Sequence, residues 1–283
     1  MSAAGRLWAR APLWRAVVVL AATASLLALV YPPVSRPEPV VAATGHYTQL
    51  PPQLDPFPVQ PRESGVFTLG TLRIPLPSGD WHAMRTFHSN GRTPEARGIL
   101  LLSFAGKRLT GAVLLFGTPS AAPAQGDPAP TLNCTQSDHY VSRDTSAGDR
   151  SRQDCWFLKP DSPARSWAAG GPPNHEPSGT LAAAAASLHE QDVAIPPVML
   201  LTSYFVAEGT RWLQVTYYIV PTIIDEAPRL PDWVAGKAQT DPAKAAYIAR
   251  ADHWAEQWAT LVRRGFAGQL TQADIPADLA TGP

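Results

Sequence analysis

The stretch VMLLTSYFVAEGTRWLQVTYYIV, residues 198–220, decides the fold of this 283-residue chain. Two apolar runs rich in β-branched and aromatic residues flank the polar segment EGT, which is the pattern of a β-hairpin. The second run alternates between two faces, with Leu213, Val215, Tyr217 and Ile219 on one and Trp212, Gln214, Thr216 and Tyr218 on the other. This alternation predicts a strand in an antiparallel sheet.

Upstream segments extend this sheet. ILLLSF and LTGAVLLF, residues 99–104 and 109–116, flank the glycine-containing loop AGKR and predict a second hairpin. VFTLGTLRIPL, residues 66–76, is expected to form one strand in which Gly70 makes a bulge. Residues 81–87 are expected to form the next strand.

Two helices are predicted downstream. Residues 180–190, TLAAAAASLHE, have high helix propensity. A longer helix begins at Asp241 and Pro242, which suit the N-cap and the first helical position, and Gly265 suits the residue after its end. Apolar residues recur along it at helical spacing: Tyr247, Ala251, Trp254, Trp258, Leu261 and Val262. We expect this stripe to cover the sheet.

Strands joined by hairpins, with one helix inserted late and one at the end, predict an α+β fold. We expect an antiparallel β-sheet domain with the long C-terminal helix packed on one face. The domain is predicted to span residues 65–270, followed by a flexible tail at residues 271–283. The formal net charge is zero and the lysines are few and scattered, so no nucleic-acid partner is expected.

The first residues predict a membrane anchor. The apolar run AVVVLAATASLLALVY follows three arginines, and no acidic residue precedes Glu38. This order predicts a cytoplasmic N-terminus at residues 1–15 and a transmembrane signal anchor at residues 16–34. The alternative is a cleaved signal peptide, whose best cleavage site, VAAT at residues 41–44, lies well past the apolar run. A buried core helix is disfavoured because the run has no polar face.

Residues 35–64 are predicted to form a stiff linker. Prolines recur at short intervals from Pro37 to Pro61, which favours an extended, polyproline-like chain. The alanine- and proline-rich composition favours a bacterial source. The expected topology is a single pass through the inner (plasma) membrane, with the folded domain in the periplasm.

The two cysteines of the chain, Cys134 and Cys155, bracket the polar segment CTQSDHYVSRDTSAGDRSRQDC. Both lie beyond the anchor, where an exported domain meets oxidising conditions, so we predict a disulfide that closes a loop too polar to pack by itself. The alternatives are two free thiols and a metal site that also uses His139 and His175. The cysteine spacing is far from the closely paired cysteines of structural zinc sites.

Short motifs of catalysis are missing from the sequence. It contains no G-x-S-x-G elbow, no G-x-G-x-x-G loop, no P-loop and no redox C-x-x-C. HEQDV, residues 189–193, begins like a zinc-binding H-E-x-x-H but ends in Val193. We therefore predict no catalytic residue, metal ligand or cofactor, and the sequence favours a protein that is not an enzyme.

Two groups of residues remain as candidates for binding. His82 and His88 are six residues apart on one predicted strand, and we expect them to share a face and so a metal ion or a proton. The simpler interpretation is two partly exposed histidines. Asp138, His139 and Arg143 lie between the cysteines, where their mixed charges could form a recognition surface. The simpler interpretation there is a solvated loop.

Three functions are compatible with these features. The first is a non-catalytic accessory or assembly protein, anchored by residues 16–34 and bound to another envelope protein. The second is an envelope enzyme or metal binder whose site is assembled from distant residues. The third is a small-molecule-binding module with a pocket between sheet and helix. The lack of local motifs favours the first.

Overall fold

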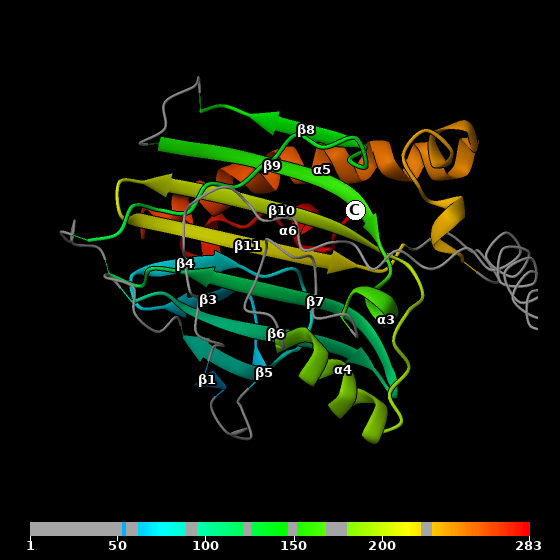
Figure 1. Ribbon diagram of the computed structural model, residues 1–283, viewed down its shortest axis with the longest axis horizontal. Coiled ribbons are helices and arrows are strands. Elements are labelled where there is room, and N and C mark those ends of the chain that lie inside the picture. The colour runs from blue at the N-terminus through cyan, green and yellow to red at the C-terminus, as the bar shows by residue number, and fades with distance from the viewer. Residues whose placement is uncertain are drawn as a thin grey trace, which may run out of the picture. The chain divides into compact units, whose positions relative to one another are not determined.

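The hairpin of residues 198–220 lies in the middle of a large antiparallel sheet in the computed structural model of the chain (Figure 1). The structure describes residues 53–54, 62–88, 95–120, 126–146, 152–167, 180–221 and 228–283. Strands β10 (Met199–Glu208) and β11 (Arg211–Ile219) pair directly, and Gly209 has a φ of +63° in the turn between them. Two-residue hairpin turns that match the twist of the strands require positive φ, so this prediction is confirmed.

The sheet has nine strands in the order β1-β5-β6-β7-β11-β10-β9-β8, with β2 also paired to β5. Each pair of neighbouring strands described in this sheet is antiparallel. The other strands of this sheet are β1 (Gln53–Leu54), β2 (Arg62–Glu63), β5 (Trp81–His88), β6 (Arg97–Ala105), β7 (Arg108–Gly117), β8 (Val141–Asp144) and β9 (Arg152–Asp161). The predicted hairpin of residues 99–116 is confirmed as β6–β7.

Residues 66–76 form two strands, so the prediction of a single bulged strand is wrong. β3 (Val66–Leu69) and β4 (Leu72–Pro75) pair with each other in a separate two-stranded sheet. Gly70 lies in the turn between them with a φ of +60°. The dipeptide Gly-Thr also makes the turn of the central hairpin, at Gly209 and Thr210. It therefore indicates a turn at Gly70 and not the bulge that we predicted.

The segment that precedes and includes Cys155 contributes two strands that the sequence did not reveal. β8 pairs with β9, and β9 pairs along its length with β10, so the segment forms an edge of the sheet rather than a loop. β9 is buried on both faces, with Cys155 and Phe157 on one and Trp156 and Leu158 on the other. A strand covered on both faces has no polar alternation, which explains why we missed it.

Helix α5 (Pro242–Phe266) packs on one face of the sheet, as predicted (Figure 1). Its predicted apolar stripe is buried throughout. Tyr217 of β11 meets Trp254 and Trp258 edge-on, with ring centroids 6.0 and 5.9 Å apart, and the two tryptophan rings stack at 4.8 Å. Aromatic side chains therefore fill the space between the sheet and the helix.

The end of α5 differs from the prediction. Gly268, with a φ of +74°, follows the helix, and the N–H groups of Gly268 and Gln269 donate to the carbonyls of Gly265 and Arg264 in a Schellman arrangement. Gly265 lies inside the helix instead. A Cβ there would stand 1.8 Å from the carbonyl oxygen of Arg73, so this glycine permits the close contact between α5 and β4.

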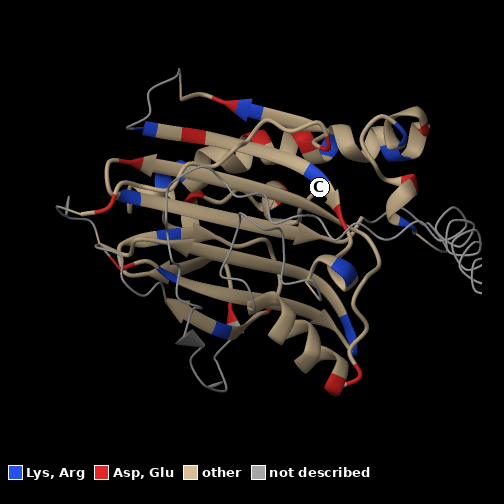
Figure 2. Ribbon diagram, viewed as in Figure 1, with Lys and Arg blue, Asp and Glu red and all other residues tan. Residues whose placement is uncertain are grey.

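The opposite face of the sheet carries a second apolar layer. Helix α4 (Thr180–Glu190) is confirmed there and buries Leu181, Ala184 and Leu188, while the short α3 (Pro163–Ser166) leads to Trp167, which meets Tyr218 edge-on at 5.5 Å. The middles of β6, β7, β10 and β11 carry no charged residue (Figure 2). The sheet is therefore an apolar layer with one covering on each face.

Segments that we assigned to the linker and the tail also contact the sheet domain. β1 and β2 fall within the predicted linker, residues 35–64, and pair with β5. The terminal segment, residues 271–283, contains η3 (Gln272–Asp274) and α6 (Ala277–Ala280). The indole N–H of Trp254 donates to the carbonyl of Leu279 over 2.9 Å, so this segment contacts α5. The connection between β11 and α5 includes η1 (Leu230–Asp232) and η2 (Ala238–Thr240).

The predicted N-terminal segments, residues 1–15 and 16–34, lie outside the described residues. Of the helices that the structure does describe, none has the length and apolar character needed to cross a membrane.

Candidate functional site

The predicted disulfide links Cys134 to Cys155, with Cα atoms 6.2 Å apart. Both residues are buried in the apolar layer on the α4 face. Gln153 of β9 binds the main chain of Leu132, two residues before Cys134. Its side-chain amide accepts from the N–H of Leu132 over 3.0 Å and donates to the carbonyl of Leu132 over 2.5 Å. The structure thus contains the predicted disulfide, and His175, which the metal alternative also used, lies outside the described residues.

His139 lies where the disulfide segment meets β8 and β9. Its ring stacks on Phe157, with centroids 4.0 Å apart and planes 4° from parallel. Nδ1 lies 2.9 Å from the carbonyl oxygen of Cys134 and 3.0 Å from Oγ of Ser142, and Nε2 lies 3.5 Å from Oδ1 of Asp138. The side chain of His139 is only 1% exposed. The two predicted candidates therefore lie together, with the carboxylate of Asp138 beside the buried imidazole of His139.

Asp138, His139 and Ser142 have the residue types of a hydrolytic triad, but the contacts do not activate the hydroxyl. A carbonyl oxygen only accepts hydrogen bonds, so the Nδ1 beside Cys134 must carry the ring proton. That nitrogen cannot then take the proton of the Ser142 hydroxyl, as a general base does when it activates a nucleophile. The contacts position the imidazole instead.

Lys159 of β9 sets the electrostatics of this cluster. Its Nζ lies 3.0 Å from Oδ2 of Asp138. Burial raises the pKa of Asp138, but the hydrogen bond and charge of Lys159 outweigh it, and the pKa lies below its usual range. Burial lowers the pKa of His139, and although Asp138 and the Cys134 carbonyl oppose this effect, the net direction is downward. The imidazole is therefore held in its neutral form.

Arg143, the third candidate from this segment, lies on the other face of the sheet edge. It stands opposite Trp156 on β9, and its guanidinium lies 5.9 Å from the centroid of that indole. Its nearest ion pair is with Asp252 of α5, at 4.0 Å. The structure thus brings Asp138 and His139 together and separates Arg143 from both.

A stronger ion pair joins the same sheet edge to α5. Nε of Arg263 lies 2.6 Å from Oδ2 of Asp154, and both side chains are partly exposed, at 37% and 26%. Asp144, in turn, accepts from the main-chain N–H of Ser146 over 2.8 Å. Of the described charges in this segment, Arg143 and Asp154 therefore pair with α5, and Asp138 pairs with Lys159 within the edge itself.

His82 and His88 lie on opposite faces of β5, so the prediction that they share a face is wrong. A bulge at Met84 breaks the alternation, and His82 stands opposite Leu102 whereas His88 stands opposite Arg97. Six strand residues also span about 20 Å, which is too far for one metal ion. Within the described ranges, no three His, Cys, Asp or Glu side chains are placed to hold a metal ion.

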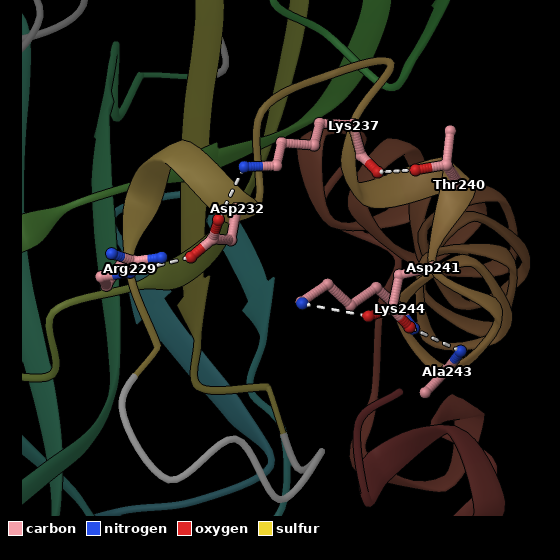
Figure 3. Close-up of polar contacts among 7 residues, drawn as sticks. All are labelled: Arg229, Asp232, Lys237, Thr240, Asp241, Ala243 and Lys244. Atoms are coloured by element: carbon pink, nitrogen blue, oxygen red, sulfur yellow. Dashed lines mark hydrogen bonds and ion pairs between the residues drawn. The ribbon is translucent and has the colours of Figure 1, made fainter.

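A polar network at the start of α5 was only partly foreseen (Figure 3). Asp241 caps the helix as predicted, accepting from the N–H of Lys244 over 3.2 Å and pairing with its Nζ at 3.2 Å. Asp232 accepts from Lys237 over 2.7 Å and from Arg229 over 3.0 Å, and these contacts hold its pKa below the usual range. The network fixes the connection into α5, because each of its cations pairs with a carboxylate of the same segment.

Comparisons with known proteins place the chain in no family. No protein-family model matches it, and no curated protein or solved structure shows significant similarity to it.

Proposed function

We propose that the chain is a membrane-anchored accessory or assembly protein of the cell envelope that acts without catalysis. Residues 16–34 cross the inner membrane once, with the N-terminus in the cytoplasm. The C-terminal domain then lies in the periplasm, where it binds another envelope protein.

The buried disulfide is the observation that carries this proposal. Cys134 and Cys155 are buried in the apolar layer of the α4 face, and their bond joins the segment before β8 to strand β9. Such bonds form and persist in oxidising compartments. The arginines that precede the apolar run at residues 16–31 support the same location.

Two features support a role without catalysis. The imidazole of His139 is committed to a carbonyl and does not activate Ser142. The space in which a pocket between sheet and helix would lie is filled by Tyr217, Trp254 and Trp258. These contacts give His139 and the three aromatic residues a structural role.

The described surface also indicates how a partner would be bound. Val234, at 42% exposed, is the one large apolar side chain exposed among the described residues. A partner would therefore use polar contacts or main-chain pairing at a sheet edge rather than an apolar patch.

The location is tested by counting free thiols in whole cells. A thiol-reactive polymer added to acid-quenched cells shifts a reduced protein on a gel once for each free thiol. We expect no shift for the full-length chain and two shifts for a matched variant that lacks residues 1–34 and stays in the cytoplasm. Two free thiols in the full-length chain would refute the proposed location.

The partner is tested separately by cross-linking in intact cells. The tagged full-length chain, recovered from membranes, is expected to carry one envelope protein at constant stoichiometry. The variant without residues 1–34 serves as the control and is expected to lose that protein. Recovery of the full-length chain alone would refute the accessory role and leave the location intact.

A further inference from the structure

One side chain joins three parts of the sheet edge. His139 contacts the main chain of Cys134, the hydroxyl of Ser142 in β8 and the ring of Phe157 in β9. β8 has only four residues, all at least partly exposed. An edge strand of this length depends on the few contacts at its beginning, and His139 makes three of them.

The other face of β8 is held by two further contacts. The hydroxyl of Tyr140 donates to the carbonyl of Trp233, and Arg143 faces Asp252 at 4.0 Å. Burial raises the pKa of Tyr140 far above neutrality, so its hydroxyl keeps its proton at every working pH. The Tyr140 contact therefore does not respond to mild acid, whereas His139, on the α4 face, is a buried imidazole that can gain a proton.

Nε2 is the nitrogen that gains a proton in acid, because Nδ1 already donates to Cys134. Nε2 faces Oδ1 of Asp138 at 3.5 Å, which is too long for a good hydrogen bond. The other carboxylate oxygen of Asp138 is taken by Lys159. Within the described part of the chain, Asp138 from the same loop and Lys159 from β9 are the charged groups that act on the ring.

We propose that His139 is an acid-sensitive latch for β8: protonation of Nε2 puts a charge into the closed stack and releases β8 from β9, while the disulfide keeps the released segment tethered. Burial of the ring determines whether acid stabilises or destabilises the closed state, because it holds the pKa of His139 in that state below its ordinary value of 6.5. A neutral imidazole fits the closed state better than a charged one, so the closed state has its full stability at pH values above the ordinary pKa of histidine. This stability is lost as the pH falls towards the lowered value. β8 is thus held at neutral pH and released in acid.

Release of β8 would bare the main-chain N–H and C=O groups on the outer edge of β9. Such an edge pairs readily with a strand of another protein. This consequence rests on the proposed function, because an envelope domain meets the pH of the surroundings. The latch itself does not depend on that location.

The test is amide hydrogen exchange of the full-length protein in detergent micelles between pH 8 and pH 5. Protection of residues 141–144, corrected for the intrinsic exchange rate, is compared with that of β10 and β11. Linkage to one proton lets protection of β8 fall by at most about tenfold per pH unit. We expect a fall in β8 and none in β10 and β11. Constant protection of β8 across this range would overturn the latch.

Three variants identify the group. His139→Gln keeps a donor near Cys134 and removes the titration, so the pH response of β8 should vanish. His189→Gln, at the exposed end of α4, is the matched control and should keep the wild-type response. A response that persists in His139→Gln would overturn the latch.

Lys159→Met keeps the proposal testable if His139→Gln fails to fold. Without Lys159, the carboxylate of Asp138 is available to the protonated ring, so release should move to lower pH. If Asp138 were the titrating group, loss of Lys159 would instead move release to higher pH. An unchanged or upward shift therefore refutes the assignment to His139.

Discussion

The α5 side of the sheet and its disulfide edge are stabilised in different ways. On the α5 side, a continuous apolar stripe meets the sheet through stacked and edge-on aromatic rings. At the disulfide edge, made of β8, β9 and the segment after Cys134, β9 pairs with β10 along its length, whereas β8 and the segment before it are joined to β9 by a short ladder, one covalent bond, one stacked imidazole and one ion pair. The α5 side is thus stabilised by apolar contacts shared among many side chains, whereas the attachment of β8 depends on a few specific contacts.

This difference predicts how each region responds to damage. Apolar burial is shared among many neighbours, so removal of one large side chain lowers the stability of the whole domain. A specific bond at an edge holds mainly its own strand, so its removal should free that strand before the rest of the sheet. Three experiments test this contrast.

The largest effect is expected on the α5 side, from Trp258→Ala. Trp258 is fully buried, stacks on Trp254 and meets Tyr217 edge-on. Loss of the ring should reduce the free energy of unfolding by about 3–5 kcal/mol, measured by urea denaturation of the full-length protein. Trp258→Phe is the matched control and should lose much less. A loss below about 1 kcal/mol in Trp258→Ala would show that the interface tolerates a hole and is not the dominant core.

The second effect is expected at the disulfide edge, from the double variant Cys134→Ala, Cys155→Ala. The bond spans 21 residues, and its loss should lower stability by about 3 kcal/mol through the added entropy of the unfolded chain. Hydrogen exchange should show loss of protection in β8 before β10 and β11. Equal loss across all three strands would remove the distinction between a locally held edge and a shared core.

The same contrast explains what the sequence revealed of the fold. The stripe of α5 and the central hairpin could be predicted because their information is local: a residue and its neighbours at fixed spacing are enough. β9 was missed because burial on both faces removes the alternation that marks a strand. Gly265 was misplaced because its reason for being glycine, the carbonyl of Arg73, lies on another element.

The candidate site divides in the same way. The disulfide could be predicted from two cysteines and a compartment. The face shared by His82 and His88 could not, because the bulge at Met84 depends on pairing with β6. His139 was singled out for its charge, but its role arises from Phe157 and the Cys134 carbonyl, which only the folded chain brings to it.

The smallest effect is expected where the two regions meet, at the ion pair between Arg263 of α5 and Asp154 of β9. The atoms approach to 2.6 Å, but both side chains are partly exposed, so solvent screens the attraction. A double-mutant cycle with Arg263→Ala and Asp154→Ala should give a coupling energy of about 0.5–1 kcal/mol. The longer Arg143–Asp252 pair, at 4.0 Å, serves as the matched control and should give less. A coupling above about 2 kcal/mol at Arg263–Asp154 would mean that a specific charge pair, and not apolar burial alone, ties β9 to α5.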